Sequence, residues 1–201
     1  EAKASDHEKH TRAFLKIQDG CNNFCSYCII PFARGPVRSR DKDSIISEAV
    51  HLVENGYHEI VLTGIHTGGY GSDLKDYSFY ELLQDLSNIP NLDIIRISSI
   101  EINELTDDIL HLIASKDNFA NHLHIPLQSG SERVLKEMRR KYTKSDFEAM
   151  INNIRSIIPS IAITTDVIVG FPTETDDEFL EMKSFIEKMA FTELHVFPYS
   201  K

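Results

Sequence analysis

Short apolar runs alternate with longer amphipathic segments along most of the chain. The runs are rich in β-branched residues, which is typical of buried strands. The segments between them repeat apolar residues every three or four positions, as a helix with one buried face does. This pattern predicts six strands, at residues 13–18, 59–64, 92–99, 122–127, 161–170 and 193–200.

Helix-start signals lie between the predicted strands. Ser78 with Glu81, and Thr175 with Glu178, have the spacing of a capping box, in which a hydroxyl and a carboxylate satisfy free amide groups at the start of a helix. Gly56 is placed to end the first long helix. We therefore expect helices to begin at Asp43, Ser78, Thr106, Ser131, Thr143 and Thr175.

The size of the repeating unit limits the fold class to α/β. Six strand–helix units leave roughly 30 residues for each, the usual size of a βαβ step, which predicts parallel strands with right-handed crossovers. A complete barrel of eight units takes about 250 residues, so six units form at most a partial barrel with an open side. The alternation alone is equally compatible with an open, doubly wound sheet. In both folds the site lies at the carboxyl ends of the strands.

Composition adds limits on location and partners. Hydrophobic residues make up 41% of the chain, as in ordinary globular domains, and no apolar run reaches the roughly 18 to 20 residues of a membrane helix. Residues 1–11 are polar, which predicts a flexible leader or a linker rather than a signal peptide. The net charge of −10 counts against independent binding of nucleic acid, although Arg34, Arg38, Arg40 and Lys42 form one basic stretch.

All the cysteines lie close together after the first predicted strand, at Cys21, Cys25 and Cys28. An odd number at this spacing is unsuited to disulfides, which favours reduced thiols and a cytoplasmic protein. Thiolates bind zinc or iron–sulfur clusters, and three of them leave one metal position open, as in a reactive centre. One alternative is zinc, with one of the nine histidines as fourth ligand. The other is a plain electron-transfer cluster, which is expected to need a fourth thiolate.

The spacing Cys21-x-x-x-Cys25-x-Tyr27-Cys28 resembles the signature of the radical S-adenosylmethionine (SAM) superfamily. This resemblance implies that the three cysteines hold a [4Fe-4S] cluster. It also implies that SAM chelates the fourth iron through its amino and carboxylate groups and is cleaved to a 5′-deoxyadenosyl radical. The implied fold is a partial (β/α)6 TIM-like barrel, open on one side, which agrees with the number of units counted above.

Longer segments are similar to the catalytic domain of methylthiotransferases, namely residues 12–40, 62–71, 124–143, 165–175 and 193–201. Among these enzymes the stretches IQDGC, ARGPVRSR and TGIHTGGYG most resemble the MtaB type. That type implies the addition of a methylthio group at carbon 2 of threonylcarbamoyl-adenosine beside the tRNA anticodon. Enzymes acting on isopentenyl-adenosine in tRNA or on a ribosomal protein, and a zinc-binding interaction module, are the alternatives.

The resemblance also implies contacts with SAM. Tyr27 is expected at the adenine end of SAM. Thr63 and Gly64 take the place of a Gly-rich segment that binds the amino group, although the usual Gly-Gly-Glu is absent. The other expected contacts are Gln128 and Ser129 for the ribose or carboxylate, and Val169 and Phe171 for the adenine.

Two further positions bear on the comparison with methylthiotransferases, one at Thr173 and one at the arginine pair Arg139 and Arg140. Thr173 stands where relatives usually have glycine, which predicts a different local turn. Arg139 and Arg140 are either surface charges, or one of them contacts a SAM carboxylate or an RNA phosphate.

Methylthiotransferases of this type have three parts, of which this sequence resembles one. We expect residues 12–201 to be the radical SAM catalytic domain, without the N-terminal domain that carries a second cluster and without the C-terminal TRAM domain. The expected partners are tRNA, as the substrate of the full-length enzyme, and a one-electron donor such as flavodoxin or ferredoxin. No membrane partner is expected.

Overall fold

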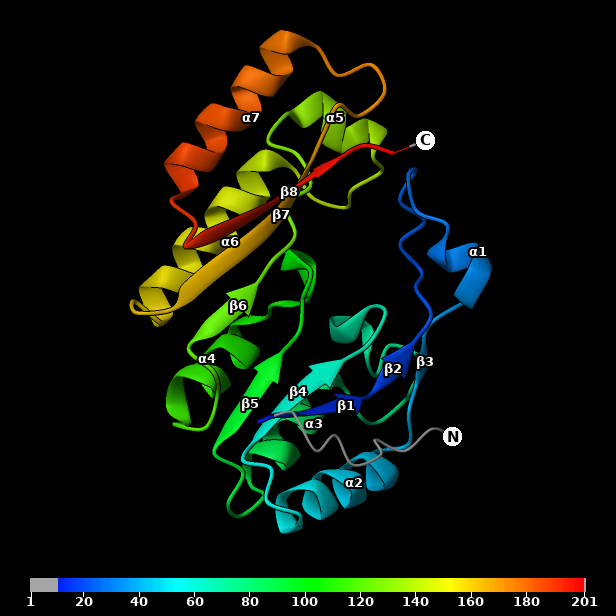
Figure 1. Ribbon diagram of the computed structural model, residues 1–201, viewed down its shortest axis with the longest axis vertical. Coiled ribbons are helices and arrows are strands. Elements are labelled where there is room, and N and C mark those ends of the chain that lie inside the picture. The colour runs from blue at the N-terminus through cyan, green and yellow to red at the C-terminus, as the bar shows by residue number, and fades with distance from the viewer. Residues whose placement is uncertain (1–10, 201) are drawn as a thin grey trace.

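The computed structural model describes residues 11–200, so most of the predicted leader lies outside the described residues (Figure 1). All six predicted strands are present and parallel to their sheet neighbours. They are β1 (Ala13–Lys16), β4 (Glu59–Thr63), β5 (Ile94–Ile97), β6 (His122–His124), β7 (Ala162–Val169) and β8 (Glu193–Pro198). The helices are α1 (Ile30–Arg34), α2 (Lys42–Glu54), α3 (Phe79–Ser87), α4 (Asp107–Ser115), α5 (Glu132–Glu137), α6 (Lys144–Ile157) and α7 (Asp176–Met189).

The strands follow one another in chain order, which distinguishes a barrel wall from a doubly wound sheet. One parallel sheet has the order β1-β4-β5 and a second has the order β6-β7-β8. Main-chain bonds between the segments that contain β5 and β6 include the one from Ile100 N, after the end of β5, to His124 O at 3.0 Å. The wall does not close, and Figure 1 shows its open side between the two sheets and the segment around α1. The predicted partial barrel is confirmed.

Three elements around the cysteines were not predicted. The very short strands β2 (Gln18–Asp19) and β3 (Arg38–Ser39) form an antiparallel pair, with Asp19 opposite Arg38. Helix α1 lies between them and has a proline in its first turn, where a missing amide donor costs nothing. Together they turn residues 20–37 into a closed loop beyond the first strand. Two turns of 3₁₀ helix, η1 (Thr67–Gly69) and η2 (Ile102–Glu104), complete the elements.

Most helices begin where the sequence indicates. The capping boxes of α3 and α7 are formed, Thr143 forms a third with Asp146, and Thr106 caps α4 through its hydroxyl. The prediction that Asp43 caps α2 is wrong, because the Asp41 carboxylate accepts the capping bond from Ser44 N at 2.9 Å. Asp43 lies in the first turn, where its charge still favours the helix N-terminus. Ser131 has the N-cap position of α5 but makes no capping bond.

The core lies between the strands and the helices. Side chains alternate along each strand, so that Leu15, Ile60 and Leu62 are fully buried on the side that the helices cover. Burying one such side chain stabilises the fold by about 1.5–3 kcal/mol. The helices contribute equally buried partners, including Ile45, Leu82, Leu83, Phe147 and Ile151. No helix of residues 11–200 combines the length and the apolar character needed to cross a bilayer.

Candidate metal centre

The three cysteines lie on the loop between β2 and β3, and the loop's own main chain holds its shape. Gly20 enters it with φ of +77°. The amide of Cys21 donates to Gly35 O at 3.1 Å, which closes the loop at its base. The amide of Cys28 donates to Cys25 O at 3.0 Å, which forms a tight turn between these two cysteines. The spacing in sequence thus becomes a compact arrangement beyond the carboxyl end of β1.

All three thiols are free and half-buried, and their surroundings differ. Burial alone would raise the pKa of Cys21, but hydrogen bonds from His66 and from the Asn23 amide lower it below its usual value. Burial raises the pKa of Cys25, and the nearby Arg140 offsets this only in part. Positively charged side chains from elsewhere in the fold, His66 and Arg140, therefore lie next to two of the thiols.

His66 approaches the loop from the end of β4. Its Nε2 forms an ion pair with Glu104 and lies 3.3 Å from the Asn23 side-chain amide. Burial would lower the pKa of His66, but its hydrogen bonds with Cys21 and Glu104 outweigh that effect and raise the pKa to about 10. His66 is therefore held as a cation beside Cys21.

Arg140 approaches the loop from the opposite half of the wall. Its side chain is only 4% exposed and forms an ion pair with Glu101. One guanidinium nitrogen, Nη1, lies 3.4 Å from Cys25 Sγ and 3.3 Å from the Tyr27 hydroxyl. Nε donates to the Tyr142 hydroxyl at 3.1 Å. Of the two neighbouring arginines considered from the sequence, Arg140 contacts the cysteine loop directly, whereas Arg139 is exposed and lines the cavity beside it.

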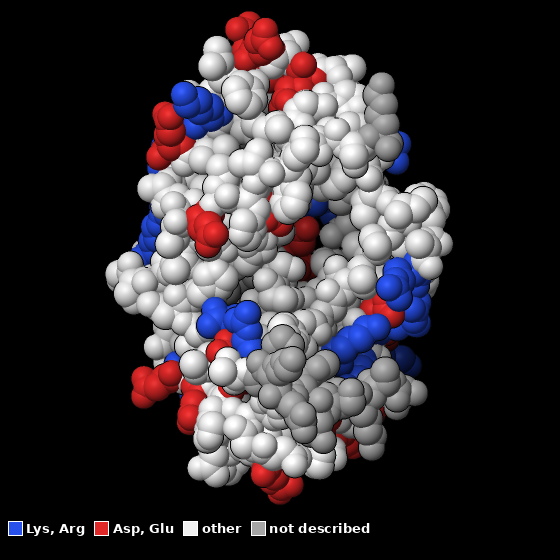
Figure 2. Space-filling model, viewed as in Figure 1, with Lys and Arg blue, Asp and Glu red and all other residues white. Residues whose placement is uncertain are grey.

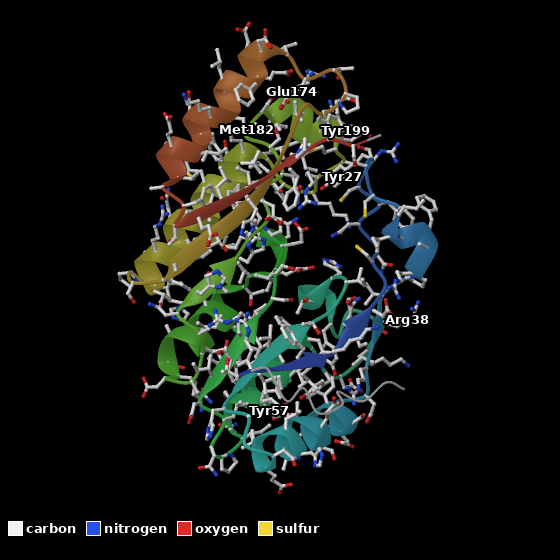
Figure 3. All side chains as sticks on the ribbon, in the orientation of Figure 1. Tyr27, Arg38, Tyr57, Glu174, Met182 and Tyr199 are labelled. Carbon is white, nitrogen blue, oxygen red and sulfur yellow. The ribbon has the colours of Figure 1, made fainter. Side chains whose placement is uncertain are left out.

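Main-chain contacts join the loop to the segment that carries Arg140. The Ser26 amide donates to Met138 O at 3.1 Å and the Ser26 hydroxyl to Glu137 O at 2.7 Å. The Tyr27 ring packs edge-on against Phe171, and Phe171 packs edge-on against Tyr199. Figure 3 shows Tyr27 and Tyr199 close to each other above the open side of the wall.

A cavity of about 310 Å³ lies between the loop and the strand ends. Figure 2 shows a hollow in the middle of this face, with acidic and basic atoms in its depth. The volume is within the range of small-molecule sites. The lining residues are Asn22, Asn23, Cys25, Val37, His66, Gly68, Gly69, Ser72, Glu101, Asn103, Glu104, Arg139, Arg140, Lys141 and Tyr142.

The structure places the residues expected to contact SAM in three groups, and none of them lines this cavity. Thr63 and Gly64 end β4, and Gly64 packs so closely on Gln18 that a Cβ there would lie 2.8 Å from its side-chain oxygen. Tyr27 and Phe171 lie together in a small apolar cluster. In the third group, Gln128 and Ser129 follow β6, and Val169 is the last residue of β7.

The members of this last group differ in access. Gln128 has φ of +67°, and its amide donates to Asp166 O at 2.8 Å. Ser129 is fully buried, and its hydroxyl accepts from the Ser131 amide at 3.2 Å. Val169 packs against the main core. Each of these contacts with SAM remains a prediction.

Thr173 keeps a conformation that favours glycine. Its φ is +72°, in the left-handed region. Arg133 donates to the Thr173 hydroxyl at 3.2 Å and to the Thr173 carbonyl oxygen at 2.7 Å. A left-handed backbone costs threonine more free energy than it costs glycine, and these hydrogen bonds stabilise it.

The basic stretch after the loop is largely paired with acidic groups. Arg40 forms an ion pair with Glu48 at 2.5 Å. Arg34 and Arg38 each lie 3.9 Å from Asp19 and are about half exposed. Only part of the positive charge seen in the sequence is therefore available to a partner.

Comparison with known proteins gives the family. A family model described as the radical SAM superfamily matches residues 15–186. The chain belongs to the radical SAM superfamily. Solved radical SAM proteins share the fold at low sequence identity: the methyltransferase TsrM from Kitasatospora setae has a TM-score of 0.75 at 15% identity and covers 92% of this chain and 36% of its own. Coproporphyrinogen III oxidase from Escherichia coli has a TM-score of 0.65 at 17% identity and covers 94% and 44%.

Two curated relatives are more similar in sequence. The chain is 57% identical over 192 residues to the threonylcarbamoyladenosine tRNA methylthiotransferase MtaB of Bacillus subtilis, which covers 95% of this chain and 43% of that protein. It is 42% identical over 197 residues to the tRNA-2-methylthio-N(6)-dimethylallyladenosine synthase of Clostridium tetani, with 98% and 44% covered. The chain therefore spans less than half the length of these relatives.

Proposed function

We propose that residues 12–201 are the catalytic domain of a tRNA methylthiotransferase that modifies carbon 2 of threonylcarbamoyl-adenosine beside the anticodon. The observation that carries the proposal is a loop of three free thiols, beyond the carboxyl end of β1 and beside a cavity, in a radical SAM fold. The 57% identity to a threonylcarbamoyladenosine enzyme, against 42% to a dimethylallyladenosine enzyme, favours this nucleoside over isopentenyl-adenosine.

The donor set of the loop fits a [4Fe-4S] cluster held by Cys21, Cys25 and Cys28. Thiolate is the ligand that such clusters require, and three thiolates leave one iron for SAM. When bound, the cluster supplies the electron for reductive cleavage of the SAM sulfonium. A relative of the same fold, TsrM, has been solved with a [4Fe-4S] cluster bound.

The chain's own residues would bind, orient and exclude water. Arg140 and His66 place positive charge on two sides of the loop: His66 helps to lower the pKa of Cys21, and Arg140 offsets part of the rise that burial gives to the pKa of Cys25. Tyr27 and Phe171 supply an apolar surface next to the cysteines, as expected for the adenine end of SAM. A protein promotes radical chemistry mainly by holding the reactants in the geometry of attack and by keeping solvent away from them.

A zinc site is the second candidate, because the structure brings a histidine to the loop. Cys21, Cys25, Cys28 and His66 form the ligand set of a closed Cys3His zinc site. Against it, His66 Nε2 already forms an ion pair with Glu104 and lies 3.3 Å from the Asn23 side-chain amide, so the geometry uses this nitrogen for contacts other than a metal.

The whole reaction involves more than this chain. We infer that tRNA is the substrate of the full-length enzyme, that flavodoxin or ferredoxin supplies the electron, and that the protein is cytoplasmic. The domain alone is expected to cleave SAM slowly to 5′-deoxyadenosine and to leave tRNA without a methylthio group, because a second cluster that provides sulfur is expected on the N-terminal domain.

Anaerobic reconstitution with iron and sulfide tests the proposal. The expected result is about four iron atoms per chain, a visible spectrum that changes when SAM is added, and 5′-deoxyadenosine after reduction. Cys25→Ser should lose the iron, whereas Ser26→Ala, a matched change on the same loop, should keep it. His66→Gln should retain the iron if the cysteines bind a cluster and should lose a stoichiometric metal if they bind zinc.

The proposal is contradicted if the chain binds one zinc per molecule in a His66-dependent way, or if its iron spectrum does not respond to SAM. Methylthiolation of tRNA by this chain alone would contradict the part that requires another domain.

A further inference from the structure

A second group of metal-ligating side chains lies away from the cysteine loop, on the second half of the wall. His124, Asp166 and His195 come from β6, β7 and β8, which are neighbours in one sheet. His124 Nε2 lies 3.0 Å from Asp166 Oδ2, and His195 Nδ1 lies 3.0 Å from Asp166 Oδ1. The two imidazole rings stack with centroids 5.6 Å apart.

The strand pattern puts these side chains on the face opposite the core. Along β7, Thr165 and Val167 are buried, and Val167 is part of the core. Successive side chains of a strand point to opposite faces, so Asp166 lies on the other face of the sheet. Its carboxylate is 22% exposed, His124 is 13% exposed and His195 is 49% exposed. The group is therefore partly enclosed and accessible from one side.

The second ring nitrogen of His124 has an outer partner. His124 Nδ1 lies 2.9 Å from the hydroxyl of the buried Thr164, whereas His195 Nε2 lies 3.7 Å from Glu193, which is too far for a hydrogen bond. Metal-binding histidines usually use their second ring nitrogen in this way, because the contact fixes the tautomer and the ring orientation. His124 is thus held so that Nε2 faces Asp166.

The distances suit a shared metal ion. Ligand atoms about 2.1 Å from one ion, at angles of about 90° to 109°, lie about 3.0 to 3.4 Å apart. The two histidine–aspartate distances are both 3.0 Å, each to a different oxygen of the Asp166 carboxylate, and one ligand atom from each residue lies within 4.8 Å of the others. Two histidines and one carboxylate, with positions left open, are the ligand set of catalytic zinc sites and of non-haem Fe(II) sites.

A second histidine–aspartate contact differs from this group in its exposure and in its number of metal-ligating side chains. His58 and Asp93 also lie 3.0 Å apart, but both are about two-thirds exposed, and no third metal-ligating side chain joins them in the described part of the chain. That pair provides a matched control for a surface ion pair.

We propose that His124, Asp166 and His195 form a second metal site, separate from the cysteines, which takes one divalent transition-metal ion of the Zn²⁺ or Fe²⁺ class. The open positions of the ion face the accessible side of the group. The site does not depend on the function proposed for the cysteine loop, because none of its ligands belongs to that loop.

Zinc titration tests the site without the thiolates. In a chain carrying Cys21→Ser, Cys25→Ser and Cys28→Ser, isothermal titration calorimetry with Zn²⁺ should show one ion per chain, and Zn²⁺ should raise the melting temperature. Asp166→Asn should weaken binding by at least about 10-fold, which is the low end for disturbing a metal site. Asp93→Asn should leave the binding unchanged.

Two further variants protect the test against loss of folding. His195→Gln changes a half-exposed side chain and should weaken binding as Asp166→Asn does, with an unchanged circular dichroism spectrum. Thr164→Val, which removes the hydroxyl that lies 2.9 Å from both His124 Nδ1 and His122 Nε2, should weaken Zn²⁺ binding by about 10- to 100-fold. If the serine variant does not fold, Asp166→Asn in the unaltered chain should remove one bound Zn²⁺ per molecule.

Absence of Zn²⁺ binding in the folded cysteine-free chain, or binding that Asp166→Asn and His195→Gln leave unchanged, would overturn the proposal. The three residues would then be an ion-pair network only.

Discussion

Replacing Gly20 with alanine should separate two costs that are usually mixed, namely backbone strain and steric exclusion. Gly20 has φ of +77°, and an added Cβ would lie 1.9 Å from Pro36 O and 2.7 Å from Gly35 O. Gly56, at the end of α2, has φ of +89°, and an added Cβ there would have no atom within 4 Å. The two glycines thus share a backbone conformation and differ in the space around them.

The magnitudes follow from these contacts. A left-handed backbone costs alanine about 1–2 kcal/mol at either position. At Gly20 the Pro36 carbonyl must also move by about 1 Å, because Cβ atoms do not approach closer than 3.0 Å. That movement disturbs the bond from Cys21 N to Gly35 O and the pairing of Asp19 with Arg38, each worth about 1 kcal/mol. We expect a loss of about 3–4 kcal/mol for Gly20→Ala and about 1–2 kcal/mol for Gly56→Ala.

Urea unfolding of the two variants measures the difference directly, and iron content after anaerobic reconstitution shows whether the cysteine loop keeps its shape. Gly20→Ala should unfold at lower urea than Gly56→Ala and hold less iron, while Gly56→Ala should hold as much as the unaltered chain. Equal unfolding free energies for the two variants, together with full iron content, would refute the reasoning.

The other two predictions concern charged groups. Arg140→Met should lower the free energy of unfolding by about 3 kcal/mol, because it leaves Glu101 without its buried partner, whereas Arg139→Met at an exposed site should change it by less than about 0.5 kcal/mol. Urea midpoints that match between these variants would contradict this. Hydrogen bonding to Arg133 lowers the pKa of Glu178 from 4.5 to about 2, so its stabilising effect is present above pH 4.5 and is lost as the pH falls towards 2. The stability difference between the unaltered chain and Glu178→Gln should therefore shrink between pH 6 and pH 3, and a constant difference would argue against it.

Elements fixed by local sequence were predictable. The strands and most caps depend on neighbouring residues, and they form where the pattern places them. Asp41 and Asp43 are both suitable caps, and the choice between them depends on which residue adopts the extended backbone, φ −56° and ψ 132°, that Asp41 has. The two-residue strands β2 and β3 are too short to give a periodic signal.

The site was predictable only in part, because its members meet through the fold. The cysteines are close in sequence, and their spacing alone indicates a metal centre. Arg140 reaches Cys25 from 115 positions further along the chain, and His66 reaches the loop from the end of β4. No spacing rule connects residues so far apart. A polar residue just after a predicted strand was the available signal for His66, since strand ends are where sites form in this class of fold.

The seam between β5 and β6 gives the cysteine loop a mechanical role. The two half-sheets are separate in their strand pairing, although one hydrophobic core runs through both. The loop starts from the first half, yet its Ser26 and Cys25 contact Met138 and Arg140 of the second half. It therefore connects the two halves on the open side of the wall. These contacts help to set the width of the opening, and so the size of molecule that fits between the halves.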